Sequence, residues 1–433
     1  MATVEYKCPN CAAPLTFDAT KKIIKCDFCD SEFAPDVIES ENLSKPSRHV
    51  NSRIDSEYIE GEKAEEYWMK LNANTTGYNC PSCGGAIICT ENSAALFCPY
   101  CGNPAIIESS VSGDFRPDYI IPFSKTKDEA KAGYKKFVEK YKFMPKEFVR
   151  EHTPEKISGI YVPYHLMSCN VAASATYSGE THERWVAGNK EYTKTNYYTH
   201  KRAGHMSFEN VPADASSSIE DSYMESVEPF NYKKIEPFKS VYLSGYLADK
   251  YDMSIEQCRE RLDARVRGTI TKELKQSVTN KGYENVSVDS HSEKISDETF
   301  SYALFPLWLL RTKFKDKYYY FAMNGQTGKV AGKLPTDGKK INFVSFLFSL
   351  LGIAVGFLIW LFANNNKLLY GIIGGVIAMI VIFFVARGII YGKSSNVASK
   401  RDADFYETAP VNLTVDTDTY IRSHTSVRVI RND

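Results

Sequence analysis

Two long apolar stretches near the end of the chain stand out in its pattern of hydrophobic and polar positions. Phe343 to Ala363 is a run of 21 residues without a charge, and Leu368 to Ala386 is another of 19. A helix needs about 20 apolar residues to cross the hydrocarbon layer of a membrane. Because only residues 364–367 separate the two runs, the pattern predicts a transmembrane two-helix hairpin over residues 341–391.

Basic residues flank this hairpin on both sides, and no apolar signal segment follows the initiator methionine. By the positive-inside rule, both flanks are expected in the cytosol. The chain is therefore predicted to be a multi-pass cell-membrane protein with cytoplasmic N- and C-termini. A signal anchor would explain one span alone, but it would not explain the pair. The cations are Lys333, Lys339 and Lys340 before the hairpin, and Arg387, Lys393, Lys400 and Arg401 after it.

Glycines recur four residues apart in each span, as Gly352 and Gly356 in the first and Gly371 and Gly375 in the second. This spacing lets helix backbones approach closely, so we expect helix packing there, with Gly356 against Gly375. The alternative is that glycine is simply frequent in membrane helices. Neither span contains Asp, Glu, Lys, Arg or His, which argues against ion transport. The hairpin is most simply an anchor.

Residues 115–335 alternate helical and strand-like patterns and predict a mixed α+β domain. Apolar spacing predicts helices over Lys127–Tyr141 and Ser254–Leu274. Each is followed by an aromatic strand-like segment with an internal proline, Pro163 or Pro306, which suits an edge or a bulge. An internal helix-then-strand duplication is one interpretation. Polar residues 35–77 indicate a linker with a helical candidate at 64–71, and the cytoplasmic tail 392–433 suggests a small hairpin.

Four cations alternate before a run of aromatic residues, and they predict one strand that ends at an Asn324-Gly325 hairpin turn. A solvated strand face is the ordinary interpretation. The second hypothesis is lipid-headgroup contact, because the first membrane span begins about 25 residues later, in reach of anionic lipid. The residues concerned are Arg311, Lys313, Lys315 and Lys317.

Eight of the eleven cysteines form four Cys-x-x-Cys pairs, and all four positions of the first set recur 72 residues later. Two residues between thiolates form a tight turn that points both sulfurs at one ion. We expect two small β zinc ribbons, over residues 1–34 and 78–108, with two structural Zn²⁺ ions. Dithiol redox chemistry and an iron centre are the rival interpretations. The ligands are Cys8, Cys11, Cys26, Cys29, Cys80, Cys83, Cys98 and Cys101.

Charge weighs against nucleic acid as the partner. The chain has 53 basic and 53 acidic residues, and residues 78–108 contain no Lys or Arg. A phosphate-binding surface needs a surplus of cations. The histidines His182, His200 and His205 fit no catalytic motif and are expected in exposed loops. No catalytic constellation is visible, so we do not expect an enzyme.

The knuckles Cys8-Pro9-Asn10-Cys11 and Cys80-Pro81-Ser82-Cys83, together with the Tyr161–Tyr164 and Asn324–Val330 segments, resemble bacterial TFIIB-type zinc-ribbon-containing membrane proteins of the YdjG-like kind. The resemblance implies a role beside a PspA-type protein and an SPFH-domain protein in cell-envelope stress. The leading hypothesis is a membrane-anchored adaptor or scaffold that recruits a cytosolic protein to the lipid bilayer. The alternatives are a membrane-tethered nucleic-acid binder and an enzyme of unknown reaction in the middle domain.

Overall fold

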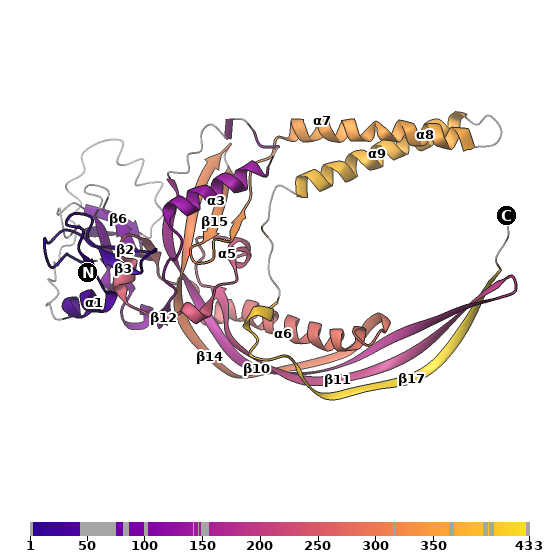
Figure 1. Cartoon of the computed structure of the whole chain (residues 1–433), viewed down its shortest axis with the longest axis horizontal. Helices are drawn as coiled ribbons and strands as arrows, with labels where there is room; N and C mark the ends of the chain where they lie inside the picture. Colours follow the sequence, from indigo (N-terminus) through magenta and orange to yellow (C-terminus); the bar gives the residue numbers. More distant parts are fainter. Residues whose placement is uncertain are drawn as a thin grey trace.

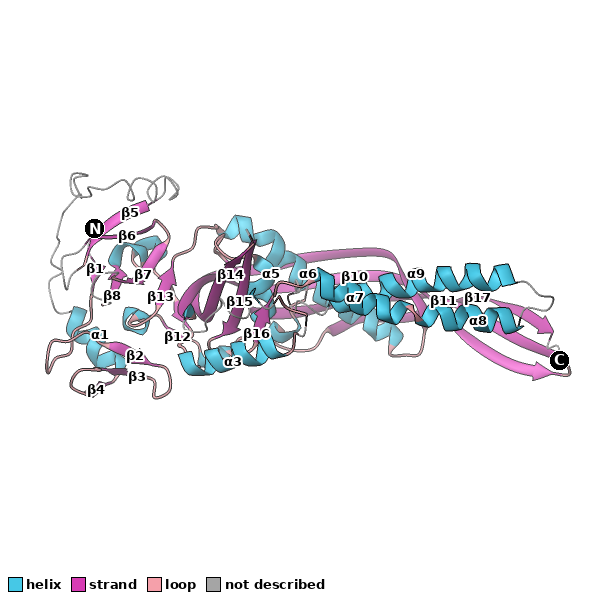
Figure 2. Cartoon of the chain, turned by 90° about the horizontal axis from the view of Figure 1, so that it is seen from above, coloured by secondary structure: helices cyan, strands magenta, loops and turns pink. Residues whose placement is uncertain are grey.

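The computed structural model describes residues 3–43, 75–80, 86–98, 103–141, 143–145, 147–148, 156–315, 317–362, 368–392, 397 and 402–429. Small β modules that carry the cysteines lie at one end of the molecule (Figure 1), and a mixed sheet with helices forms its middle. A long curved sheet and a pair of apolar helices extend from this middle toward the same side, as Figure 2 shows from above.

The first cysteine module is a three-stranded antiparallel sheet followed by a helix, and the second consists of two antiparallel strand pairs. β1 pairs with β8, so the start of the chain is held on the second module. The prediction of a linker was wrong at its start, because residues 35–43 form the helix α1. The helical candidate at 64–71 lies outside the described residues. The elements are β1 (Thr3–Val4), β2 (Thr16–Asp18), β3 (Ile23–Lys25), β4 (Glu32–Phe33), α1 (Pro35–Leu43), β5 (Thr75–Asn79), β6 (Ala86–Thr90), β7 (Ser93–Phe97) and β8 (Pro104–Ile107).

Two β-α-β-β segments build the middle of the chain. The first contains β9 (Tyr119–Ile120), α3 (Lys127–Glu139), β10 (Ser158–Ala187) and β11 (Lys190–Asp214). The second contains β13 (Leu247–Asp249), α6 (Ile255–Thr279), β14 (Glu284–Phe314) and β15 (Lys317–Asn324). β10 and β14 pair antiparallel at the centre, and each short strand runs parallel to the long strand of the other segment. The order of one short strand, one helix and two further strands is therefore the same in both segments.

The two helices begin with the same local structure. Thr126 caps α3 and Ser254 caps α6, each within a capping box completed by Glu129 or Gln257. Each box satisfies two backbone N–H groups that would otherwise lack partners at the helix start. Both predicted helices are confirmed, with Ser254 as the cap and α6 extended by five residues beyond the predicted Leu274.

The sequence suggested that the two internal prolines lie at an edge or a bulge, but the structure places both in the central strand pair. Pro163 pairs with Leu304 and Pro306 with Tyr161 in the central strand pair. On the outer side of β10, pairing with β13 covers residues 160–161 and pairing with β11 begins at 164, so Pro163 falls between two neighbours. Pro306 lies in the same way between β9 and β15. A residue without an N–H group is tolerated there because no ladder bond is lost.

β10, β11, β14 and β17 (Asn412–Val429) form a long antiparallel extension, which we call the arm. α6 packs on it through Val266 and Ile270, within a cluster that includes Val171 and Met206 of the strands. The predicted small hairpin in the tail was wrong. The tail forms one continuous strand because its polar middle, residues 416–426, also pairs with β11.

The strand predicted through Arg311 and Lys317 is in fact a hairpin. β14 ends at Phe314, Lys315 adopts a positive φ of 47°, and β15 begins at Lys317. Arg311 therefore faces Tyr320, and Phe314 faces Lys317, across the two strands. The four cations surround the tip of this hairpin instead of lining one strand face.

The remaining elements close the sheet and its covering layer. β12 pairs with β9, and β16 pairs with β15 across a turn in which the Lys329 carbonyl accepts from the Asn324 N–H at 2.8 Å, which confirms the predicted hairpin turn. These elements are η1 (Glu108–Ser110), η2 (Gly113–Phe115), α5 (Asp221–Val227), η4 (Tyr232–Lys234), β12 (Glu236–Pro237), η5 (Ser240–Leu243), β16 (Val330–Gly332) and η6 (Asp404–Tyr406).

Three apolar helices follow, namely α7 (Gly338–Ser349), α8 (Leu351–Phe362) and α9 (Leu368–Gly392). Two helical stretches, of 21 and 22 residues, are long and apolar enough to cross a membrane. They expose large side chains such as Phe357 and Ile377 at more than half of their surface. A core helix of a globular domain would bury these side chains, so the exposed apolar surface favours a lipid environment.

Candidate metal centre

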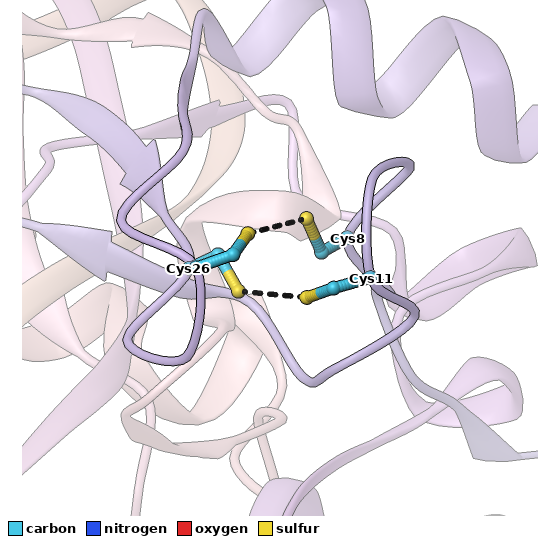
Figure 3. Close-up of side chains that lie close together, drawn as sticks. Cys8, Cys11 and Cys26 are labelled. Atoms are coloured by element: carbon cyan, nitrogen blue, oxygen red, sulfur yellow. Dashed lines mark hydrogen bonds between the residues drawn. The ribbon is translucent and has the colours of Figure 1, made fainter.

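Two backbone turns of the first module present its cysteines. The N–H of Cys8 donates to the carbonyl of Ala13 at 2.8 Å, and that of Cys26 donates to the carbonyl of Ser31 at 2.9 Å. In each turn the second cysteine of the pair lies three residues after the first, so the side chains converge on the same space (Figure 3). Cys8 and Cys26 are buried, whereas Cys11 and Cys29 are exposed.

The four sulfurs have the spacing of a tetrahedral metal site. Sγ of Cys8 lies 3.6 Å from Sγ of Cys29, and Sγ of Cys11 lies 3.5 Å from Sγ of Cys26. All four sulfurs lie within 4.8 Å of one another. Disulfide sulfurs would be about 2.05 Å apart. A zinc–sulfur distance of about 2.3 Å places tetrahedral ligands about 3.8 Å apart, close to the observed spacing.

The residue after each second cysteine adopts a left-handed backbone conformation. φ is 59° at Ala12 and 56° at Asp30. Glycine favours this conformation because it has no Cβ. The second module has Gly84 and Gly102 at the corresponding positions of the sequence. The sequence of the second set therefore suits the same left-handed turn, and only the second set has glycine at that position.

The thiols of the first module alter one another's pKa values. A backbone hydrogen bond at Ala13 lowers the pKa of Cys11, but desolvation and hydrogen bonds with the other three cysteines raise it to about 12. Hydrogen bonds from the side chain and backbone of Ser31 lower the pKa of Cys29 to about 6. A bound cation would stabilise all four thiolates together, so metal binding would release protons.

Half of the second cysteine set belongs to the described residues. Cys80 and Cys98 are almost fully buried and pack with Ala105. The N–H of Cys98 donates to the carbonyl of Asn103 at 2.8 Å, five residues on, as the N–H groups of Cys8 and Cys26 do. Cys83 and Cys101 lie outside the described residues. One of the two predicted turns thus repeats the geometry of the first module.

The first module is attached rigidly to the middle domain by Glu39 of α1. Its carboxylate accepts hydrogen bonds from Tyr6 Oη at 2.7 Å, from the Ser240 N–H at 3.2 Å and from the Val241 N–H at 3.1 Å. No motif in the sequence pointed to Glu39, because its partners in the middle domain, Ser240 and Val241, lie about 200 residues away. The four-cysteine group is therefore fixed to the body of the protein.

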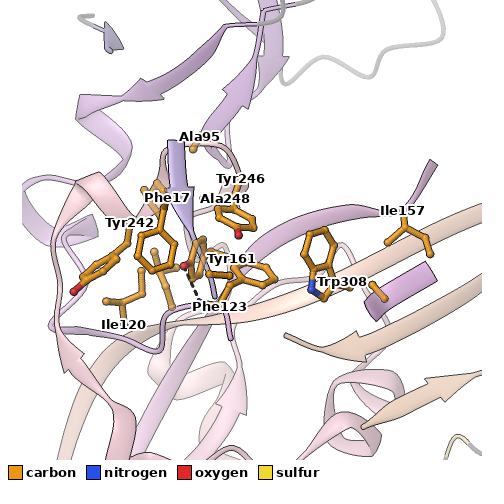
Figure 4. Packing of buried hydrophobic residues seen from close by; sticks show 14 of the residues in the cluster. Phe17, Ala95, Ile120, Phe123, Ile157, Tyr161, Tyr242, Tyr246, Ala248 and Trp308 are labelled. Carbon is orange, nitrogen blue, oxygen red and sulfur yellow. Dashed lines mark hydrogen bonds between the residues drawn. The ribbon is translucent and has the colours of Figure 1, made fainter. Parts of the chain in front are cut away.

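Apolar packing reinforces this attachment. Phe17 of the first module meets Tyr242 edge-to-face at 5.1 Å between ring centroids. Figure 4 shows Phe17, Ala95 of the second module and Tyr161 of the central strand in one buried cluster. The first cysteine module is therefore not an isolated unit, because its apolar residues share a core with the middle domain.

The structure brings together some of the other candidate residues. Gly356 lies against the backbone of Gly371 and Gly375, where an added Cβ would fall 2.7 and 2.8 Å from their atoms, and Gly352 lies against Met379. Arg311 stacks over the ring of Tyr318 at 4.0 Å. Lys315 approaches Glu147 at 4.0 Å. The side chain of Lys313 lies outside the described set.

The histidines are not in loops, which corrects the sequence interpretation. His182 lies in β10, and His200 and His205 lie in β11. His200 is fully buried, and its Nδ1 is 2.8 Å from Oδ1 of Asp418, which also accepts from Arg202 Nη2 at 2.6 Å. These groups join β11 to the tail strand β17. The sequence held no local sign of this pairing.

A polar cavity of about 320 Å³ lies where α6 begins, lined by Asp114, Asp118, His165, Tyr251 and Glu256 among others. The His165 ring shares a hydrogen bond at 2.9 Å through Nε2 with the carbonyl of Met253. Burial lowers the pKa of this histidine, which keeps the ring neutral at pH 7. Carboxylate, imidazole and hydroxyl groups thus meet at this cavity, and no nucleophile among its lining residues is hydrogen-bonded to a base.

The cysteine cluster and the apolar helices define the class: a protein with a four-cysteine group that could hold a metal ion, a mixed α/β body and two helices of membrane-spanning length. Among curated proteins, the chain is similar to the uncharacterized protein YdjG of Bacillus subtilis (strain 168), with 29% identity over 339 residues. The match covers 78% of this chain and 92% of the relative. No family model and no solved structure matches the chain.

Proposed function

We propose that this protein is a membrane-anchored zinc-ribbon adaptor that recruits a cytosolic protein to the membrane. Two Zn²⁺ ions, one per cysteine set, hold the ribbons, and α7–α9 anchor the chain as a two-pass hairpin with cytoplasmic termini. The partner is a PspA-type or SPFH-domain protein acting in cell-envelope stress, as the resemblance to YdjG-like proteins implies.

One observation carries this proposal. Phe28, between Cys26 and Cys29, exposes 83% of its side chain at the tip of the metal-binding turn. Burying such a ring on a partner would contribute a few kcal/mol, and aromatic residues dominate interface energetics. Because Glu39 fixes this module to the domain that carries the membrane helices, the ring is presented on a rigid support.

The test is capture of proteins by the full chain in mild detergent, with identification by mass spectrometry. We expect a cytosolic partner to be captured by the wild-type chain and lost with Phe28→Ala and with Cys8→Ser. Val186→Ala is the matched control, because Val186 is 62% exposed at the far end of the arm. Retention of every partner by Phe28→Ala would reject the ribbon as the docking surface.

Topology needs a separate test. Labelling of a single introduced cysteine would be hard to interpret, because the chain has eleven native cysteines. A protease site is therefore inserted after Asn189, in the turn between β10 and β11. In sealed right-side-out cells this site should resist external protease, and in inverted vesicles it should be cleaved. Cleavage in intact cells would contradict the cytoplasmic placement.

The polar cavity at the start of α6 favours a second candidate, an enzyme or ligand-binding function of the middle domain. Its test is mass spectrometry of small molecules released when the purified chain is denatured. A molecule released from the wild-type chain and absent from His165→Phe would support this alternative. A chain that releases nothing at stoichiometric amounts would leave the cavity without a resident ligand.

A further inference from the structure

A second cavity, of about 300 Å³, lies at the base of the membrane helices. Its apolar lining includes Met144 and Leu334 from the middle domain, Val344 and Phe348 from α7, and Ile390 from α9. The cavity is thus lined jointly by the body of the protein and by both helices of the hairpin.

The position of the cavity along the helices corresponds to the boundary of a bilayer. α7 starts with Lys339 and Lys340, and its exposed apolar side chains begin at Phe343. On α9, Arg387 precedes Ile390 by one turn. Phe348 lines the cavity and is itself half-exposed, so the cavity adjoins the apolar surface that lipid would cover.

Tyrosine residues lie at the level of this cavity. Tyr141 lines the cavity, and Tyr391 of α9, which is about half-exposed, directly follows Ile390 of the lining. Tyrosine is enriched at membrane–water interfaces because its ring is apolar and its hydroxyl is hydrated. These residues therefore mark the height of the lipid headgroups.

The charge at the rim is predominantly basic. Lys140 lines the cavity and is exposed. Nζ of Lys340 donates to the carbonyl of Met144 at 3.2 Å and lies 3.5 Å from Asp337, which neutralises it in part. Lys339 is exposed beside it. Lys315 and Glu147 pair nearby, so Lys140 and Lys339 carry the surplus of positive charge.

From this geometry we propose that the cavity binds one acyl chain of an anionic phospholipid, with the phosphate at Lys140. The apolar lining matches a hydrocarbon chain, and the cationic rim matches a negative headgroup. The site rests on the proposed membrane insertion of α7–α9. It goes beyond anchoring, because it makes the junction between the body and the hairpin sensitive to lipid composition.

The test is native mass spectrometry of the full chain released from nanodiscs that contain phosphatidylglycerol and phosphatidylcholine. The wild-type chain should retain one phosphatidylglycerol in preference to phosphatidylcholine. Lys140→Gln should reduce this preference by about fivefold, the effect of one surface cation on anionic lipid. Lys135→Gln is the matched control, because Lys135 is exposed on the same helix and does not line the cavity.

Cavity-filling variants test the acyl-chain half of the proposal. Met144→Trp should lose the retained lipid whatever its headgroup, and Val344→Phe fills the cavity from the helix side if the first variant does not fold. An unchanged lipid count in both would overturn the site, and equal retention of the two lipids by the wild-type chain would overturn the headgroup assignment. Flotation of the chain with liposomes reports membrane insertion separately, so the failure of the anchor is distinguishable.

Discussion

Arg265 of α6 and Glu228 face each other through two parallel hydrogen bonds, with Nη1 to Oε1 at 3.1 Å and Nη2 to Oε2 at 2.6 Å. Both side chains are almost entirely buried. The hydroxyl of Tyr406 donates to the same carboxylate at 2.7 Å, and Nε of Arg265 donates to the carbonyl of Asp402 at 3.1 Å. The pair therefore ties α6 to the segment that follows the membrane helices.

Removing one member of this pair should be costly. Glu228→Gln leaves a buried guanidinium without its counter-charge, which destabilises proteins by about 3–5 kcal/mol. We expect a much lower melting temperature for the full chain in mild detergent. Lys272→Gln is the control, because its pair with Asp404 is partly exposed and solvent-screened pairs contribute little.

A double variant separates charge from packing at the same position. Arg265→Met with Glu228→Leu removes both charges and keeps apolar volume, and such replacements are often neutral or stabilising. We expect it to melt well above Glu228→Gln. If Glu228→Gln melts like Lys272→Gln, the ion pair does not hold the tail segment on α6.

Metal analysis of the purified chain tests the two cysteine sets independently. The wild-type chain should contain two equivalents of zinc, Cys8→Ser one, Cys80→Ser one, and the double variant none. A four-thiolate site rarely keeps its ion after loss of a ligand, because the remaining charge and geometry are inadequate. One equivalent in the wild-type chain would contradict the second site, and iron in place of zinc would contradict the assigned metal.

Ala12 provides a test of the turn geometry. A non-glycine residue in the left-handed region costs about 1–2 kcal/mol, partly offset by the greater entropy of glycine when unfolded. Ala12→Gly should therefore stabilise the first module by about 0.5–1 kcal/mol and slow the loss of its metal to a chelator. Ala13→Gly, at the neighbouring position without a positive φ, should act in the opposite direction. Equal effects of the two variants would refute the assignment.

Local patterns in the sequence were sufficient for the cysteine turns and the helices. Two-residue spacing of the cysteines and the capping residues Thr126 and Ser254 act within one turn of chain, so their structure depends on neighbours only. The same holds for the apolar spans. Each of these features was visible without knowledge of the tertiary fold.

Long-range pairing was not visible in this way. β17 pairs with β11 about 220 residues earlier, and no local period identifies such a partner. The reversal at Lys315 was also missed, because lysine is an unusual residue at a positive φ. The hydrogen bonds to Glu39 were missed as well, because only the tertiary fold brings the N–H groups of Ser240 and Val241 close to its carboxylate.

Asp214 should give the stability of the chain a measurable pH dependence. Burial raises its pKa to about 7 although Arg261 lowers it, and its Oδ2 has no hydrogen-bond partner among the described residues. The folded chain then holds a proton that the unfolded chain releases above about pH 4. The free energy of unfolding should therefore fall as the pH rises from about 4 to 7, by at most about 4 kcal/mol.

Asp214→Asn should flatten this slope, as followed by melting temperature across the same pH range. Asp128→Asn is a matched control, because its carboxylate is 93% exposed on α3 and is not among the groups that act on the pKa of Asp214. We expect the control to keep the wild-type slope. Identical slopes for wild type and Asp214→Asn would show that this carboxylate stays ionised in the folded chain.

Gly356→Leu should separate the two helices of the hairpin. A Cβ at this position would already lie 2.7 Å from the carbonyl oxygen of Gly371 and 2.8 Å from Cα of Gly375, so backbone must move to accommodate it. Gly388→Leu is the control on α9, since nothing lies within 4 Å of its Cβ position. We expect a lower melting temperature in detergent for the first variant alone. Equal melting temperatures of the two variants would mean that the helices meet along another face, because backbones in contact at two glycines leave no room for a side chain there.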